Sequence, residues 1–123
     1  MGEKPGLSLL AMIIASAFAG AAGAADVCQG PAPAAGAAVH GPVLAVPDGS
    51  SLCLATGATP SAWVKIPLSR LRTSQRMLMA AAFGKNATCA IGADGRGECL
   101  VEGRPLAASL QSPEVVKAAY LWR

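Results

Sequence analysis

The stretch GKNATCAIGADGRGECLVEGRPL, residues 84–106, decides the fold of this chain. Its two short apolar segments, 88–91 (TCAI) and 98–101 (ECLV), are predicted to be β-strands. The segment 92–95 (GADG) between them has the composition of a turn, and a second turn is predicted at 102–105 (EGRP). The stretch therefore predicts a β-hairpin that carries one cysteine in each strand and Arg96 just after its turn.

The chain contains four cysteines. An even number of cysteines in a small exported chain favours disulfides over metal binding or redox chemistry, and four cysteines allow three pairings. Because a hairpin can place Cys89 opposite Cys99, that pair is favoured, which leaves Cys28 with Cys53. A zinc site is disfavoured because the sequence has no C-x-x-C pair and His40 is its single histidine.

The amino-terminal residues 1–25 have the composition of a signal peptide. Lys4 precedes an apolar segment at 7–18, and the small residues 22–24 (AGA) match the pattern that signal peptidase cleaves. The expected result is an exported protein, periplasmic or secreted, with no stable membrane anchor after cleavage; an uncleaved anchor is the alternative. A leader rich in Ala, Gly and Pro follows at 26–41, and the folded domain is predicted at 42–123.

Short apolar segments and turns alternate through the folded region. Beside the hairpin strands, the sequence predicts strands at 43–46, 51–55 and 62–68 and a helix that starts at Ser74 and ends at Gly84. A helical turn at 106–110 and a short helix from Ser112 to Trp122 complete the chain. The predicted class is mainly β with α (α+β). Five strands with one helix between the third and fourth, and a short C-terminal helix, are the arrangement of an OB-fold barrel, although other α+β sheets share this count.

Several motifs occur in an order that resembles the staphylococcal nuclease-like, or thermonuclease-like, family. The segment 46–52 (VPDGSSL) is similar to the family's V-x-D-G-D-T-L hairpin, and 64–68 (VKIPL) to its V-R-L strand. The segments 94–97 (DGRG) and 101–106 (VEGRPL) resemble its D-x-Y-G-R stretch and the strand turn that follows. The resemblance covers about residues 41–110 and implies an OB-fold.

The resemblance also implies a chemistry, which is the calcium-dependent cleavage of nucleic acid phosphodiesters. In such enzymes carboxylates hold the calcium, a glutamate helps to activate water, and two arginines hold the phosphate. Calcium neutralises charge that develops on the phosphoryl oxygens, and arginine matches the phosphate geometry.

Most of the corresponding positions differ in this chain. Asp48 matches the first aspartate of the family's turn, which is better suited to the turn than to a metal. Ser50 stands where the family has the second aspartate of that turn, and Lys65 stands in place of the first phosphate arginine. The segment 70–73 (RLRT) replaces a motif that contains a metal carboxylate and the catalytic glutamate, so a cation, Arg70, lies where calcium needs an acid.

Arg96 alone matches the family's phosphate arginine unchanged. The chain is therefore expected to be a non-catalytic OB-fold domain without a cofactor, which binds nucleic acid, another anionic ligand or a protein partner. Arg96, Lys65, Arg70 and Arg72 are the candidate anion-binding residues, and Arg76 and Lys85 extend this basic group. A solvated basic surface is the alternative, since the net charge is only +3.

Two further functions remain open. The chain is a metal-dependent nuclease if a rearranged site recruits Glu98 or Glu102 to bind calcium, and a structural envelope protein if its surface binds nothing. Trp63 is the one candidate for stacking on a base, and it is equally suited to the core.

Overall fold

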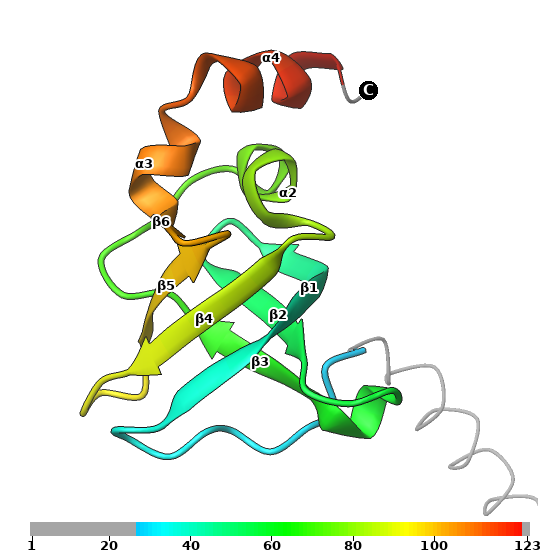
Figure 1. Ribbon diagram of the computed structural model, residues 1–123, viewed down its shortest axis with the longest axis vertical. Helices are drawn as coiled ribbons and strands as arrows, with labels where there is room; N and C mark the ends of the chain where they lie inside the picture. The colour runs from blue at the N-terminus through cyan, green and yellow to red at the C-terminus, as the bar shows by residue number, and fades with distance from the viewer. Residues whose placement is uncertain (1–26, 122–123) are drawn as a thin grey trace, which may run out of the picture.

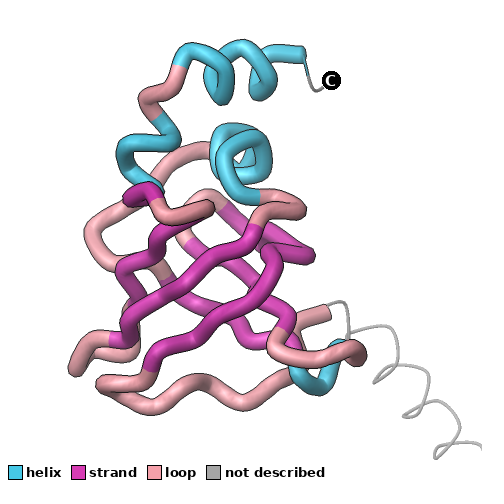
Figure 2. Tube along the Cα trace, viewed as in Figure 1, coloured by secondary structure: helices cyan, strands magenta, loops and turns pink. Residues whose placement is uncertain are grey.

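The computed structural model describes residues 27–121, so the predicted signal peptide and Trp122 lie outside the described residues. The described chain is α+β: a six-stranded sheet in the order β3-β2-β1-β4-β5-β6 lies below three short α-helices (Figures 1 and 2). The strands are β1 (Ala38–Asp48), β2 (Ser51–Ala55), β3 (Trp63–Pro67), β4 (Asn86–Ile91), β5 (Gly97–Val101) and β6 (Arg104–Pro105). The helices are α2 (Gln75–Ala82), α3 (Leu106–Leu110) and α4 (Pro113–Leu121), and a 3-10 turn, η1 (Pro60–Ala62), precedes β3.

Strand β1 belongs to both halves of the sheet. Its first part pairs with β4, from Ala38 opposite Ala90 to Pro42 opposite Asn86, and its second part pairs with β2, beginning with Val43 opposite Leu54. The switch occurs between Pro42 and Val43, next to Gly41, where a Cβ atom would lie 2.1 Å from the carbonyl oxygen of Ala55. The strand therefore begins five residues before the predicted start at 43, because pairing with β4 orders a segment that locally resembles a loop.

The two outer regions of the sheet meet at one point. A single parallel bridge joins Leu68, just after β3, to Gly97 at the start of β5, and the N–H of Ser69 donates to the carbonyl of Gly97 at 2.9 Å. Gly97 permits this approach, since a Cβ atom there would lie 2.6 Å from Cγ2 of Ile66. One bridge does not close the sheet. The α+β class is confirmed, whereas the five-stranded OB barrel stays a prediction.

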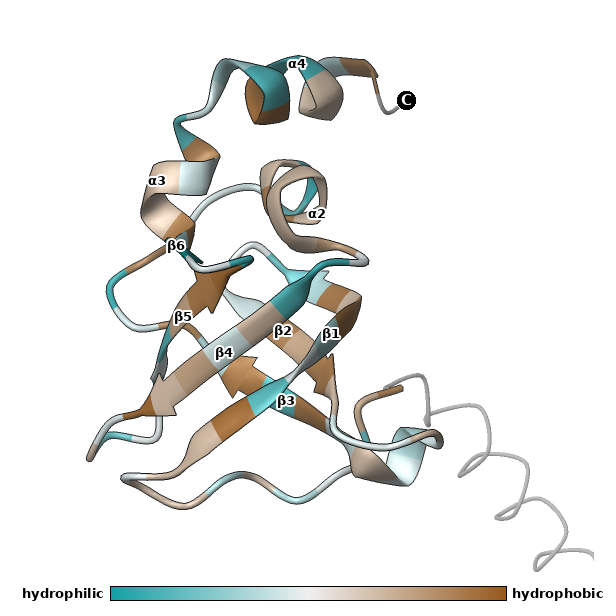
Figure 3. Ribbon diagram, in the orientation of Figure 1, coloured by the Kyte–Doolittle hydropathy of each residue, from teal (hydrophilic) through white to brown (hydrophobic). Residues whose placement is uncertain are grey.

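The central helix follows its sequence signals. Ser74 caps α2 by accepting a hydrogen bond from the N–H of Met77 at 3.1 Å, and Gly84 adopts a positive φ of 78° just after the helix, as predicted. Leu78, Ala81 and Ala82 face the core. Hydrophobic residues are concentrated in the strands, and hydrophilic ones lie mostly in the turns and on the outer side of α4 (Figure 3).

The core and both predicted disulfides are present. The side chains of Leu52, Leu54, Ile66, Leu78 and Val43 are completely buried. Cys89 lies directly opposite Cys99 in the β4–β5 register and is bonded to it, and Cys28 is bonded to Cys53. Two disulfides are typical of a protein that folds in an oxidising environment. Among residues 27–121, no helix is long and apolar enough to cross a membrane.

One predicted turn is partly a strand. Arg104 and Pro105 form β6, which pairs with Val101 and Leu100 of β5. The prediction of a turn over 102–105 was wrong at these two residues, because Glu102 and Gly103 make the turn by themselves with φ angles of 51° and 80°. Such a two-residue turn with two positive φ angles brings the flanking residues directly into pairing.

Candidate functional site

Asp48 holds the β1–β2 turn. Its Oδ1 accepts hydrogen bonds from the N–H of Ser50 at 2.9 Å, the hydroxyl of Ser50 at 3.1 Å and the hydroxyl of Ser51 at 2.7 Å. The Ser51 hydroxyl, the Ser50 N–H and hydroxyl and the positive charge of Lys65 lower the pKa of Asp48, against a smaller opposing effect of desolvation. This carboxylate is therefore ionised and already engaged by its own turn.

The residues around Asp48 do not fit the calcium ion that the family resemblance implies. Calcium takes six to eight oxygen ligands, several of them carboxylate oxygens. Here Ser50 donates a hydrogen bond to Asp48, and the positive charge of Lys65 acts on the Asp48 carboxylate. Arg70 stands at the position where the family has its other metal-binding carboxylate. Within residues 27–121, no group of three or more His, Cys, Asp and Glu side chains is placed to hold a metal ion.

Arg96 lies where β3 and β5 meet. The turn before it is ordered by Asp94, whose Oδ1 accepts the N–H of Arg96 at 3.0 Å, and by the N–H of Gly92, which donates to the carbonyl of Arg96 at 2.8 Å. Nη1 of Arg96 reaches across to the carbonyl oxygen of Leu68 at 3.4 Å. The exposed guanidinium is thus directed toward the residues that follow β3.

Two cavities border this meeting point, and each is lined by one of the other predicted cations and by a chain neighbour of Arg96. Lys65 and Pro67 of β3 line one of them together with Gly95, the residue before Arg96. Arg70 lines the other together with Gly97, the residue after Arg96. We call Lys65, Arg70 and Arg96 the basic junction, because each lies within three residues of Leu68 or Gly97, the two residues of the bridge.

Arg70 has an unusual backbone. Its φ angle is 53°, in the left-handed region that is uncommon for a residue with a Cβ atom. Its side chain lines a cavity of about 260 Å³, whose wall is formed mainly by Leu68, Leu71, Pro105 and Leu106. A strained backbone at a cavity is a reason to test Arg70 for function.

Two members of the predicted basic group, Arg76 and Lys85, line cavities away from the bridge. Arg72 is exposed on the loop between β3 and α2, two residues before the cap of that helix. Arg76 lines a cavity between α2 and α4, and Lys85 lines another, with Arg104, beside α4. Lys65, Arg70 and Arg96 are the members of the predicted basic group that lie within three residues of the Leu68–Gly97 bridge.

The two acidic residues of the rearranged-nuclease hypothesis lie apart. Glu98 lines the cavity of Arg70, whereas Glu102 lines the cavity of Lys85 and Arg104. Four residues of extended chain separate them, which corresponds to about 13 Å. The structure therefore brings one carboxylate of this pair, not two, to the basic junction.

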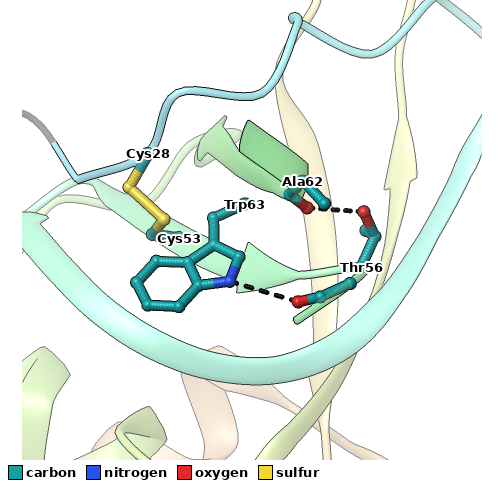
Figure 4. Close-up of a disulfide and its surroundings, with 6 residues drawn as sticks. Cys28, Cys53, Thr56, Ala62 and Trp63 are labelled. Atoms are coloured by element: carbon teal, nitrogen blue, oxygen red, sulfur yellow. Dashed lines mark hydrogen bonds between the residues drawn. A yellow bond between two sulfur atoms is a disulfide. The ribbon is translucent and has the colours of Figure 1, made fainter. Parts of the chain in front are cut away.

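Trp63 packs against the first disulfide. Figure 4 shows its ring beside the bond between Cys28 and Cys53, and its indole N–H donates to the carbonyl of Gly57 at 3.2 Å. The hydroxyl of Thr56 donates to the carbonyl of Ala62 in the same loop. The contacts of Trp63 are those of a residue that orders the loop before β3.

Sequence reasoning missed the importance of Gly97. Its missing side chain lets β5 approach Ile66, and without that approach Arg96 does not reach the carbonyl of Leu68. The glycines at 95 and 97 are visible in the sequence, where they indicate a turn and the family resemblance but not this close approach.

Comparison of the chain with models of known protein families, with curated proteins and with solved structures gave no match.

Proposed function

We propose that this chain is an exported, non-catalytic binding module of the staphylococcal nuclease-like type, which holds an anionic ligand at the basic junction. Three features support an OB barrel as its frame. These are a first strand shared between two halves of the sheet, a helix between the third and fourth strands, and a bridge between β3 and β5.

The observation that carries the proposal is the contact between Arg96 and the end of β3. The hydrogen bond from Nη1 to Leu68 orients the guanidinium, and the chain neighbours of Arg96 line two cavities, Gly95 together with Lys65 and Gly97 together with Arg70. Three cations around a point on the surface suit a phosphate, sulfate or carboxylate group, and a guanidinium can bind such a group through two parallel hydrogen bonds.

The arrangement favours binding over hydrolysis. Asp48 is engaged by its turn, and the carboxylates of Glu98 and Glu102 line different cavities. A nucleic acid or another anionic polymer is the ligand that such a basic surface binds through its charge. A protein partner with an acidic surface uses the same contacts.

The test is a binding and cleavage assay on the oxidised protein with single- and double-stranded DNA and RNA. We expect no cleavage with calcium or with chelator, and a complex that weakens as salt rises. Each phosphate contact contributes about 0.7–0.9 to the slope of log affinity against log salt. Arg96→Ala is expected to weaken binding and to lower this slope by about one such contribution.

Lys117→Ala provides the matched control, because it removes an exposed cation of α4, away from the junction. This variant is expected to bind like the unaltered protein. Calcium-dependent cleavage that Arg96→Ala abolishes would refute the proposal in favour of an active nuclease. Equal losses from Arg96→Ala and Lys117→Ala would show unspecific charge pairing and would also refute it.

A further inference from the structure

The leader forms a strap across one end of the sheet. We use this name for residues 28–37, drawn in blue and cyan below the sheet in Figure 1. At one end the strap is bonded through Cys28 to Cys53, and the N–H of Gly30 donates to the carbonyl of Trp63 at 2.8 Å. At the other end the N–H of Gly36 donates to Ile91 at 2.8 Å. The strap therefore runs from the start of β3 to the end of β4.

The middle of the strap is rich in proline, whereas its ends are fixed by backbone hydrogen bonds. Residues 31–35 (PAPAA) contain two prolines, which have no N–H to donate and favour an extended chain. Between this segment and β3 lies a cavity of about 350 Å³, which we call the strap cavity. Its lining consists of Gly30, Ala32, Pro33, Lys65, Pro67 and Gly95.

Among the residues that the structure describes, Lys65 is the one charged member of that lining. Its side chain points to the exposed face of β3, whereas the side chains of its neighbours Val64 and Ile66 point to the core. The negative charge of Asp48 acts on Lys65 from outside this lining, and its Oδ1 accepts the hydrogen bonds of its own turn. The ammonium group of Lys65 is accordingly the group in this cavity that attracts an anion.

The remaining lining is apolar, and two of its members are prolines. Proline rings provide flat surfaces on which aromatic groups pack, as in the recognition of proline-rich segments. The volume lies at the lower end of the range for small-molecule sites. A ligand that combines a small aromatic body with one negative charge matches both the walls and Lys65.

We propose that the strap cavity is a binding site for small aromatic carboxylates, with the carboxylate on Lys65 and the ring between Pro33 and Pro67. The inference extends the proposed function, since Lys65 is also part of the basic junction, but it does not require Arg70 or Arg96. The disulfide to Cys53 keeps the strap wall in place.

The experiment is a titration of the isotope-labelled, oxidised protein with benzoate, followed by two-dimensional NMR. We expect saturable shifts of the amide signals of Gly30, Ala32 and Gly95. Benzamide, which lacks the charge, and acetate, which lacks the ring, are expected to produce no saturable shift of these signals. Lys65→Met is expected to weaken benzoate binding by about tenfold or more, and Pro33→Ser more moderately.

Arg96→Ala distinguishes this inference from the proposed function. Because Arg96 is not in the lining of the strap cavity, we expect this variant to leave benzoate binding unchanged while it weakens the complex with nucleic acid. If benzoate binds but nucleic acid does not, the proposed function fails and the strap cavity stands. Absence of saturable shifts, equal responses to benzamide, or an unchanged affinity in Lys65→Met would overturn the inference. An equal loss in Arg96→Ala would place the anion at the junction and would also overturn it.

Discussion

Arg70→Gly is expected to stabilise the protein while it weakens anion binding. The φ angle of Arg70 is 53°, and a left-handed conformation costs a residue with a Cβ atom about 1–2 kcal/mol. Glycine removes this cost but loses about 0.5–1 kcal/mol through its greater freedom in the unfolded chain. The net gain is roughly 0.5 kcal/mol, which raises the Tm of a domain of this size by about 2–4 °C.

The matched variant is Arg70→Ala. It removes the same guanidinium from the cavity beside Gly97 but keeps a Cβ atom at the strained position. Both variants are therefore expected to weaken binding of single-stranded DNA equally, and only the glycine variant is expected to melt at a higher temperature. Thermal unfolding followed by circular dichroism, together with binding titrations at two salt concentrations, measures both effects.

Two results would refute the reasoning. A glycine variant that melts at or below the temperature of the alanine variant would show that the backbone at residue 70 is not strained. Unchanged binding in both variants would show that the Arg70 side chain does not contribute to the basic junction. In that case the anion site would be reduced to Lys65 and Arg96.

Three other perturbations have defined outcomes. Replacing Cys28 and Cys53 by alanine opens a loop with a sequence separation of 25 and is expected to lower the free energy of unfolding in urea by about 3.5 kcal/mol. The same change at Cys89 and Cys99, with a separation of 10, is expected to lower it by about 2.7 kcal/mol. The reverse order would contradict the explanation by loop entropy. The pKa of Asp48 is lowered in the folded state, so its stabilising effect is present above about pH 4 and is lost as the pH falls through that lowered pKa. Asp48→Asn is expected to flatten this part of the pH–stability curve, and an unchanged curve would argue against the turn hydrogen bonds. Gly41→Ala is expected to destabilise by about 1–3 kcal/mol, because its Cβ would lie 2.1 Å from the carbonyl oxygen of Ala55. Gly36→Ala, whose Cβ would meet no atom within 4 Å, adds only the strain of its φ angle, so an equal cost for both would contradict the predicted clash.

Local sequence signals predicted the local structure well. Ser74 and Gly84 mark the ends of α2 because a cap and a left-handed glycine act within one turn of helix. The 92–95 turn is read from its own four residues, and it sets Cys89 opposite Cys99 once the hairpin forms. Turns, caps and a ten-residue disulfide loop depend on interactions between near neighbours.

The candidate site was harder to predict because its residues meet through long-range contacts. Arg96 and Leu68 lie 28 residues apart, and nothing in either segment indicates that a missing side chain at Gly97 brings them together. The first residues of β1 resembled a loop for the same reason, since Ala38–Pro42 become a strand only through β4. Arg76 and Lys85 line cavities that residues of α4 help to form, and the sequence did not indicate where α4 packs.

The pairing of the four cysteines has a consequence for the route by which the protein reaches its oxidised form. The first cysteine is joined to the second and the third to the fourth, so the two covalent loops follow each other along the chain without overlapping. A chain oxidised progressively from its amino end reaches this connectivity when each cysteine bonds to the preceding unpaired one. In both other pairings, each bond joins one of the first two cysteines to one of the last two or encloses the other bond. The first cysteine must then stay unpaired until a later one is available. The native pairing is thus the one that such stepwise oxidation forms directly, without reshuffling of bonds.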